Sequence, residues 1–180
     1  YSSIGHVGFL VLALAAHSVA GVQAVLVYLA IYVAMSAGMF GCVLMMKRGG
    51  RYVENISDLA GLSKTQPLLA AAIAVFMFAM AGIPPLSGFF AKMYVVVALI
   101  DAEFVWLAVI AVIASVVACY YYLKVVKIMY FDEPAAAFDA KSHTLLNVAT
   151  VAGAIVTVGF FLWPSPLVGW AKTAAEALLK

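Results

Sequence analysis

Long apolar stretches separated by short polar segments dominate this chain of 180 residues. Four of them, residues 2–16, 22–46, 104–129 and 145–162, are predominantly apolar and have the length expected of helices that lie in a membrane. A fifth, residues 67–100, contains 34 residues and one charged side chain. The pattern therefore predicts an all-α, polytopic membrane protein with five transmembrane segments.

The third segment, residues 67–100, is too long for a single membrane helix. At about 1.5 Å per residue it would span roughly 51 Å, whereas the hydrocarbon core of a bilayer is about 30 Å thick. Pro84 and Pro85 lack backbone N–H groups, and Gly82 and Gly88 tolerate irregular backbone. We therefore predict a broken helix with these four residues at the break. Broken helices at membrane depth line polar cavities and ion pathways.

The last segment, residues 167–180, has a different pattern. Its apolar side chains recur at helical spacing opposite Lys172 and Glu176, which predicts a short amphipathic helix at the membrane interface. A frayed chain end is the alternative. We find no internal repeat, so residues 1–180 are interpreted as a single transmembrane domain.

Composition strengthens the membrane prediction. Hydrophobic residues make up 67% of the chain and charged residues 10%, which excludes an ordinary soluble domain. The net charge of +2 argues against a nucleic-acid partner. Cys42 and Cys119 both lie in apolar stretches without a CxxC or Cys/His cluster, so neither a disulfide nor a metal site is expected.

The charges between the apolar stretches predict an orientation. Two alternate inter-helix segments carry all the basic residues of the loops, and the other two carry none. The basic set is Lys47, Arg48, Arg51, Lys64, Lys124, Lys127 and Lys141. Because basic loops stay on the cytoplasmic side, the first helix should run outward and the C-terminus should lie on the outer, periplasmic side.

Lys92 is the first candidate for chemistry. A lysine at the bilayer centre is costly, about 2.5–3.5 kcal/mol on insertion scales, and usually faces a bundle interior or water. In a helix running outward its Cα–Cβ bond tilts toward the membrane middle, so functional burial is favoured over snorkelling to the outer interface. No acidic residue in the predicted spans is available to pair with it, so its partners are expected from outside the chain or from water.

His6 is the second candidate, about one turn into the first helix. A neutral histidine carries a donor and an acceptor nitrogen, so it is either a proton relay or a satisfied interhelical hydrogen-bonding group. Tyr28, Tyr32 and Ser36 share one helix face, where a packed aromatic stripe is favoured over a file of waters. Ser87 lies in the break, where its hydroxyl is expected to satisfy freed backbone groups.

Three stretches resemble the antiporter-like membrane subunits of respiratory complex I. They are YSSIGHVG at residues 1–8, GIPPLSGFFAK at residues 82–92, and residues 120–132, which begin YYYLK and end KIMYFD. The resemblance covers essentially the whole chain in order and is closest to the bacterial N-type subunits. The GIPPLSGF motif alone is shared with sister subunits and with multisubunit cation/proton antiporters.

This resemblance implies a fourteen-helix subunit of NADH:quinone oxidoreductase, of which the chain would be roughly the last five helices. Such a subunit couples electron transfer from NADH to quinone to proton translocation in the bacterial inner membrane. The family's broken-helix lysine corresponds to Lys92, and its helix-ten histidine to His6. NADH, FMN, iron–sulfur clusters and quinone would be bound by other subunits, with none in this chain.

The implied partners are the other membrane subunits of the complex, the N-terminal half of the same subunit, the lipid bilayer, protons and water. The acidic and basic relay residues of that N-terminal half have no counterpart here, so this chain alone would not form a complete proton channel. Two alternatives remain open: a subunit of a monovalent cation/proton antiporter, or a structural membrane segment without its own proton path.

Overall fold

The structure, a computed structural model, describes residues 1–139 and 144–179 and is mostly helical, which confirms the predicted class. The helices outside the third segment begin and end within three residues of the predicted bounds. They are α1 (Ser2–Ala15), α2 (Val19–Met45), α6 (Val105–Phe131), α7 (Thr144–Gly159) and α8 (Ser165–Leu178). Lys141 and Lys180 lie outside the described residues.

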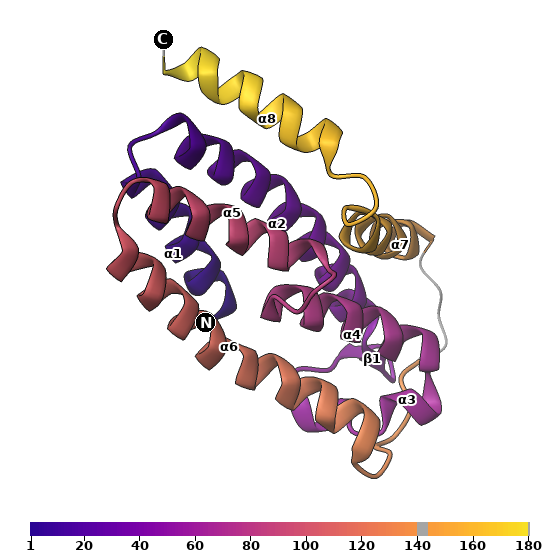
Figure 1. The fold of residues 1–180 in the computed structure, drawn as a ribbon. Coiled ribbons are helices and arrows are strands. Elements are labelled where there is room, and N and C mark those ends of the chain that lie inside the picture. The colour runs from indigo at the N-terminus through magenta and orange to yellow at the C-terminus, as the bar shows by residue number, and fades with distance from the viewer. Residues whose placement is uncertain (140–143, 180) are drawn as a thin grey trace.

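The third apolar stretch forms two helices, α4 (Pro67–Ala81) and α5 (Ser87–Asp101), that follow one another along the long direction of the molecule (Figure 1). Gly82 ends α4 in the left-handed region at φ +88°, and its N–H donates to the carbonyls of Phe78 and Ala79. The N–H of Ile83 also donates to Phe78 O, at 3.0 Å, which completes the usual glycine-terminated helix end. Residues 82–86 therefore separate the two helices.

The basic segment after α2 contains elements that the sequence analysis did not predict. A short antiparallel hairpin pairs β1 (Lys47–Arg48) with β2 (Arg51–Tyr52), followed by a 3₁₀ helix, η1 (Ile56–Leu59), and the one-turn helix α3 (Leu62–Thr65). Gly49 and Gly50 form the turn with φ of +60° and +78°. Two consecutive positive φ values match the right-handed twist of a two-residue hairpin, and glycine adopts them without strain.

Helix α2 is the centre of the bundle and packs against α1, α4, α5, α7 and α8. Close approach on α2 depends on Gly38 and Gly41. A Cβ on Gly38 would overlap the ring of Phe76, and one on Gly41 would lie 2.5 Å from Thr150 Oγ1. At Gly5 and Gly8 on α1, by contrast, an added Cβ would meet no atom of the described residues within 4 Å.

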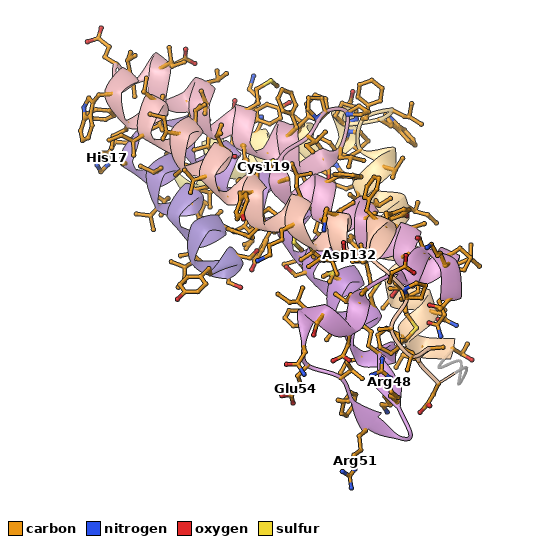
Figure 2. The ribbon with its side chains drawn as sticks, turned by 90° about the horizontal axis from the view of Figure 1, so that it is seen from below. His17, Arg48, Arg51, Glu54, Cys119 and Asp132 are labelled. Carbon is orange, nitrogen blue, oxygen red and sulfur yellow. The ribbon has the colours of Figure 1, made fainter. Side chains whose placement is uncertain are left out.

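Large apolar side chains cover the outside of α1 and α6. By length and composition, two of the described helices, α2 and α6, can each cross a membrane unaided, while α1, α4 and α7 are shorter apolar helices. Figure 2 shows His17 at one end of the molecule and Arg48, Arg51 and Glu54 at the opposite end. The basic hairpin and the α1–α2 turn thus lie at opposite ends of the bundle.

Candidate functional site

The Lys92 side chain on α5 reaches back to the interruption between the two helices. Its Nζ donates to three acceptors at 2.9 Å each: the carbonyl oxygens of Met80 and Ala81, and the hydroxyl oxygen of Ser115 on α6. The side chain is half-buried, and Nζ also lies 5.6 Å from the centre of the Phe9 ring. Lys92 therefore points into the bundle, toward α1, α4 and α6.

Two of these acceptors explain why the ammonium lies there. The last carbonyls of a helix have no intrahelical donor, and the negative end of the helix dipole favours a cation. Met80 and Ala81 are the last two residues of α4. The expectation that Lys92 would find partners only outside the chain or in water is therefore wrong, because backbone and hydroxyl groups of this chain surround it.

Ser87 corrects a second expectation. It is fully buried at the first position of α5, yet its hydroxyl oxygen has no hydrogen-bond partner within the described part of the chain. The prediction that Ser87 would satisfy freed backbone groups is wrong. Lys92 does so instead, one turn further along α5.

His6 lies between two phenols. It is 4% exposed; its Nδ1 is 2.7 Å from the hydroxyl of Tyr28 on α2, and its Nε2 is 3.2 Å from the hydroxyl of Tyr122 on α6. The Tyr122 hydroxyl in turn lies 2.6 Å from Ser2 Oγ. The interhelical hydrogen bonds that the sequence analysis offered as one alternative for His6 therefore exist.

The geometry is compatible with both neutral tautomers of His6. Each ring nitrogen has a hydroxyl neighbour, and a phenol can donate or accept. The donor and acceptor roles can therefore reverse along the whole row of hydrogen bonds that joins Ser2, Tyr122, His6 and Tyr28. A row of groups that can reverse its hydrogen-bond direction is able to pass a proton along its length.

Lys92 and His6 line one small, partly open space. This cavity measures about 60 Å³ and is bordered by α1, α2, α4, α5 and α6. Since water occupies about 30 Å³ per molecule in the liquid, the cavity has room for about two waters. Its polar lining residues are Ser2, His6, Tyr28, Lys92, Ser115, Tyr121 and Tyr122. The two residues predicted from the sequence are thus brought to one polar site.

Two residues of this site, Ser115 and Tyr122, were not among the candidates of the sequence analysis. In the structure Tyr122 is 4% exposed and Tyr120 is 72% exposed. The available signal was spacing: positions 115 and 122 are seven apart, two helical turns, and so share a face of α6. Tyr32 contributes its ring, 4.7 Å from that of His6, while Ser36 does not line the cavity.

A larger space of about 580 Å³ opens elsewhere, beside the end of α2 and the starts of α4 and α7. Its lining is mostly apolar and includes Leu68, Leu69 and Val151, and it contains neither Lys92 nor His6. Within residues 1–139 and 144–179, no cluster of three or more His, Cys, Asp or Glu side chains could hold a metal ion. The candidate chemistry is therefore concentrated at the small cavity.

Comparison with known proteins assigns the chain to a family. A family model described as NADH:quinone oxidoreductase/Mrp antiporter, TM, matches residues 1–118. The chain is 58% identical over 178 residues to NADH-quinone oxidoreductase subunit N of Azorhizobium caulinodans, covering 99% of the chain and 37% of that relative. The chain thus spans little more than a third of the length of the curated relatives it matches.

Two solved structures resemble the fold. A chain in respiratory complex I from Thermus thermophilus with bound aureothin superposes with a TM-score of 0.78 and 30% sequence identity, covering 94% of this chain and 38% of that one. A chain of the Mrp complex from Dietzia sp. DQ12-45-1b superposes with a TM-score of 0.80 at 24% identity, over 94% of this chain and 40% of that one, which speaks to the fold alone.

Proposed function

The chain belongs to the NADH:quinone oxidoreductase/Mrp antiporter transmembrane family, and from this premise we propose that it is part of a membrane subunit of a proton-translocating NADH:quinone oxidoreductase. In such an enzyme, electron transfer from NADH to quinone drives protons across the bacterial inner membrane. The extensive identity to proteins named NADH-quinone oxidoreductase subunit N supports this assignment over a stand-alone cation/proton antiporter.

The single observation that carries the proposal is the cavity shared by Lys92 and His6. An amine and an imidazole are the two side chains of this bundle best able to gain and lose protons, and the space between them has room for water. His6 would receive protons on the inner side through the hydroxyls of Ser2 and Tyr122. Lys92 would be the terminal relay toward the outer side.

We further propose a membrane arrangement with five crossing segments. The third would be the pair α4 and α5, since each has 15 residues, or about 22 Å of helix, and is too short to span alone. Residues 1–180 would form one transmembrane domain, with Gly82, Pro84, Pro85 and Gly88 at its broken helix. Helix α8 would lie at the interface, and the C-terminus on the outer side.

The remaining chemistry would belong to partners. NADH, FMN, the iron–sulfur clusters and quinone would be held by other subunits, and this chain would contact those of the membrane arm and the rest of its own subunit. Its share of the activity would be proton transfer, without a redox centre of its own.

The test is the Lys92→Met variant in the complete enzyme, assayed in inverted membrane vesicles. Among the described residues that line the cavity, Lys92 carries the only amine. Its loss should lower NADH-driven proton pumping at least about tenfold, because positioned acid–base groups typically contribute 10²-fold or more. Assembly should survive, since the methionine stem is similar in size.

The matched control is Lys172→Met on α8, whose side chain is 64% exposed and far from the cavity lining; it should pump normally. Normal pumping by an intact Lys92→Met enzyme would remove the role given to Lys92. Sodium-dependent transport that proceeds without NADH oxidation would contradict the enzyme assignment itself.

A further inference from the structure

The three acceptors around Lys92 differ in what they can do. Backbone carbonyls, such as those of Met80 and Ala81, can only accept hydrogen bonds. A serine hydroxyl can accept and donate at the same time. Ser115 is therefore the one of the three contacts through which a proton can pass.

The three acceptors around Lys92 match the three N–H donors of its charged ammonium group. An ammonium has three N–H donors and no lone pair, and each donor meets one acceptor at 2.9 Å. The neutral amine has two N–H groups and one lone pair. The lone pair cannot face a carbonyl oxygen without repulsion, so the neutral state needs one neighbour that turns from acceptor to donor. Only the hydroxyl of Ser115 can make that change.

Ser115 also borders the cavity that Lys92 shares with His6. Ser115 thus contacts the lysine amine through its hydroxyl and belongs to the lining of the same water-sized space. On α6 it lies two turns before Tyr122, whose hydroxyl contacts His6 from the same helix face. The same helix therefore presents one hydroxyl to each of the two candidate relay residues.

We propose that the Ser115 hydroxyl is a proton-relay group that connects Lys92 to the water of the cavity; the inference rests on the proposed proton-translocating function. When Lys92 releases a proton to the cavity, one N–H bond of the ammonium breaks and the proton forms a new O–H bond at Ser115. The original O–H bond of Ser115 breaks as its proton passes to a cavity water.

The step balances and leaves each group satisfied. Lys92 becomes a neutral amine, Ser115 remains a neutral alcohol, and the water carries the extra proton. The new O–H of Ser115 already points at the amine lone pair, so no side chain has to move. Reversal of the same two transfers reloads Lys92 from the cavity.

Other ionisable groups face this space from the elements packed around it. They are His6 on α1, Tyr28 on α2, and Tyr121 and Tyr122 on α6. Cys119 on α6 does not line the space but is an electrostatic neighbour of Lys92. No acidic side chain among the described residues lines the cavity. His6 is therefore the basic side chain on this space that would supply the proton reaching Lys92 through water and Ser115.

The experiment compares Ser115→Ala, Ser115→Thr and Lys92→Met in the complete enzyme, with NADH oxidation and proton pumping measured on the same vesicles. Ser115→Ala should lower the number of protons pumped per NADH about tenfold, and Ser115→Thr should restore it because it returns the hydroxyl. The control Thr157→Val removes a buried hydroxyl that bonds within its own helix to Gly153, and should leave pumping unchanged.

Normal pumping by Ser115→Ala, with Lys92→Met inactive, overturns the role of Ser115 and leaves the proposed function standing. Normal pumping by Lys92→Met removes the relay role that the proposed function gives to Lys92. Equal loss in the Ala and Thr variants indicates a packing role and also overturns the relay. If Ser115→Ala fails to assemble, Ser115→Val replaces it, because valine has the shape of the threonine in Ser115→Thr without the hydroxyl: reduced pumping supports the relay, and normal pumping overturns it.

Discussion

At the scale of single residues, the site is defined by hydroxyl groups that touch ionisable side chains. Tyr122 shows this most clearly, because one oxygen contacts both Ser2 and His6. Tyr121 and Tyr122 are neighbours in sequence with ring centres 4.4 Å apart, yet the Tyr122 hydroxyl is the one that reaches His6. The position of one oxygen separates a relay candidate from a packed aromatic ring.

Tyr122→Phe tests that oxygen. The change leaves His6 Nε2 and Ser2 without their partner, so we expect slower pumping and a loss of about 1–3 kcal/mol of stability, the cost of an unsatisfied buried polar group. Pumping and thermal unfolding of the purified enzyme measure the two effects. Tyr120→Phe is the control, since that ring is 72% exposed; equal effects of both changes would contradict the role of Tyr122.

Sequence reasoning found some of these residues and missed others for a physical reason. Lys92 and His6 are conspicuous because an ionisable group in an apolar stretch is energetically costly and is therefore a functional-site candidate. Ser115 and Tyr122 do not carry the energetic cost of a charged group in an apolar stretch. Serine is small enough for helix packing, and tyrosine is common at membrane interfaces. Their roles depend on which helix lies opposite, and no local pattern contains that information.

At the scale of elements, the interruption between α4 and α5 depends on close backbone packing as well as on proline. A Cβ on Gly88, at the start of α5, would overlap the carbonyl oxygen of Ala79. The start of α5 therefore lies directly against the end of α4, and this contact keeps the carbonyls of Met80 and Ala81 within reach of Lys92.

Gly88→Ala should separate these two helix ends. Overpacking a tight contact typically costs about 1–3 kcal/mol, and here the obstacle is backbone, so we expect a lower melting temperature and weaker pumping. Gly159→Ala at the end of α7 is the control, because its added Cβ meets no atom within 4 Å. A Gly88→Ala enzyme as stable and active as the control would show that the contact is dispensable.

Helix ends were predictable where composition changes sharply, as at Pro67 and Ser165 with its following proline. The hairpin of β1 and β2 was not, because two-residue strands have no periodicity to detect. Its signal was the Gly49-Gly50 pair between Lys47-Arg48 and Arg51-Tyr52, a turn motif that the surrounding charges obscured.

At the scale of the whole molecule, the distribution of basic residues predicts which end of the helix bundle faces the cytoplasm, and this orientation can be measured. The hairpin end carries Arg48 and Arg51, and an ion pair of 2.9 Å joins Arg48 to Asp58 there. That the helices would be mostly apolar was readable from the sequence. That α2 would be the central helix was not, because α2 and α6 are both long and apolar and only packing distinguishes them.

Cysteine labelling tests the orientation. With a membrane-impermeant maleimide on spheroplasts, Thr173→Cys on α8 should react without permeabilisation, and Glu54→Cys beside the hairpin should react only after it. The unsubstituted chain is the control, because Cys42 is buried and Cys119 is half-buried. The reverse pattern would place the C-terminus inside the cell.

The hydrogen bonds at both ring nitrogens of His6 have a consequence for the rate of successive proton transfers. An imidazole whose two nitrogens are both engaged cannot turn over without releasing Tyr28 and Tyr122 together. In the relay we propose, each transfer leaves the ring in the opposite tautomer. The starting tautomer is restored when both hydrogen bonds break together and the ring turns over, and this recovery step would set how often successive protons can cross.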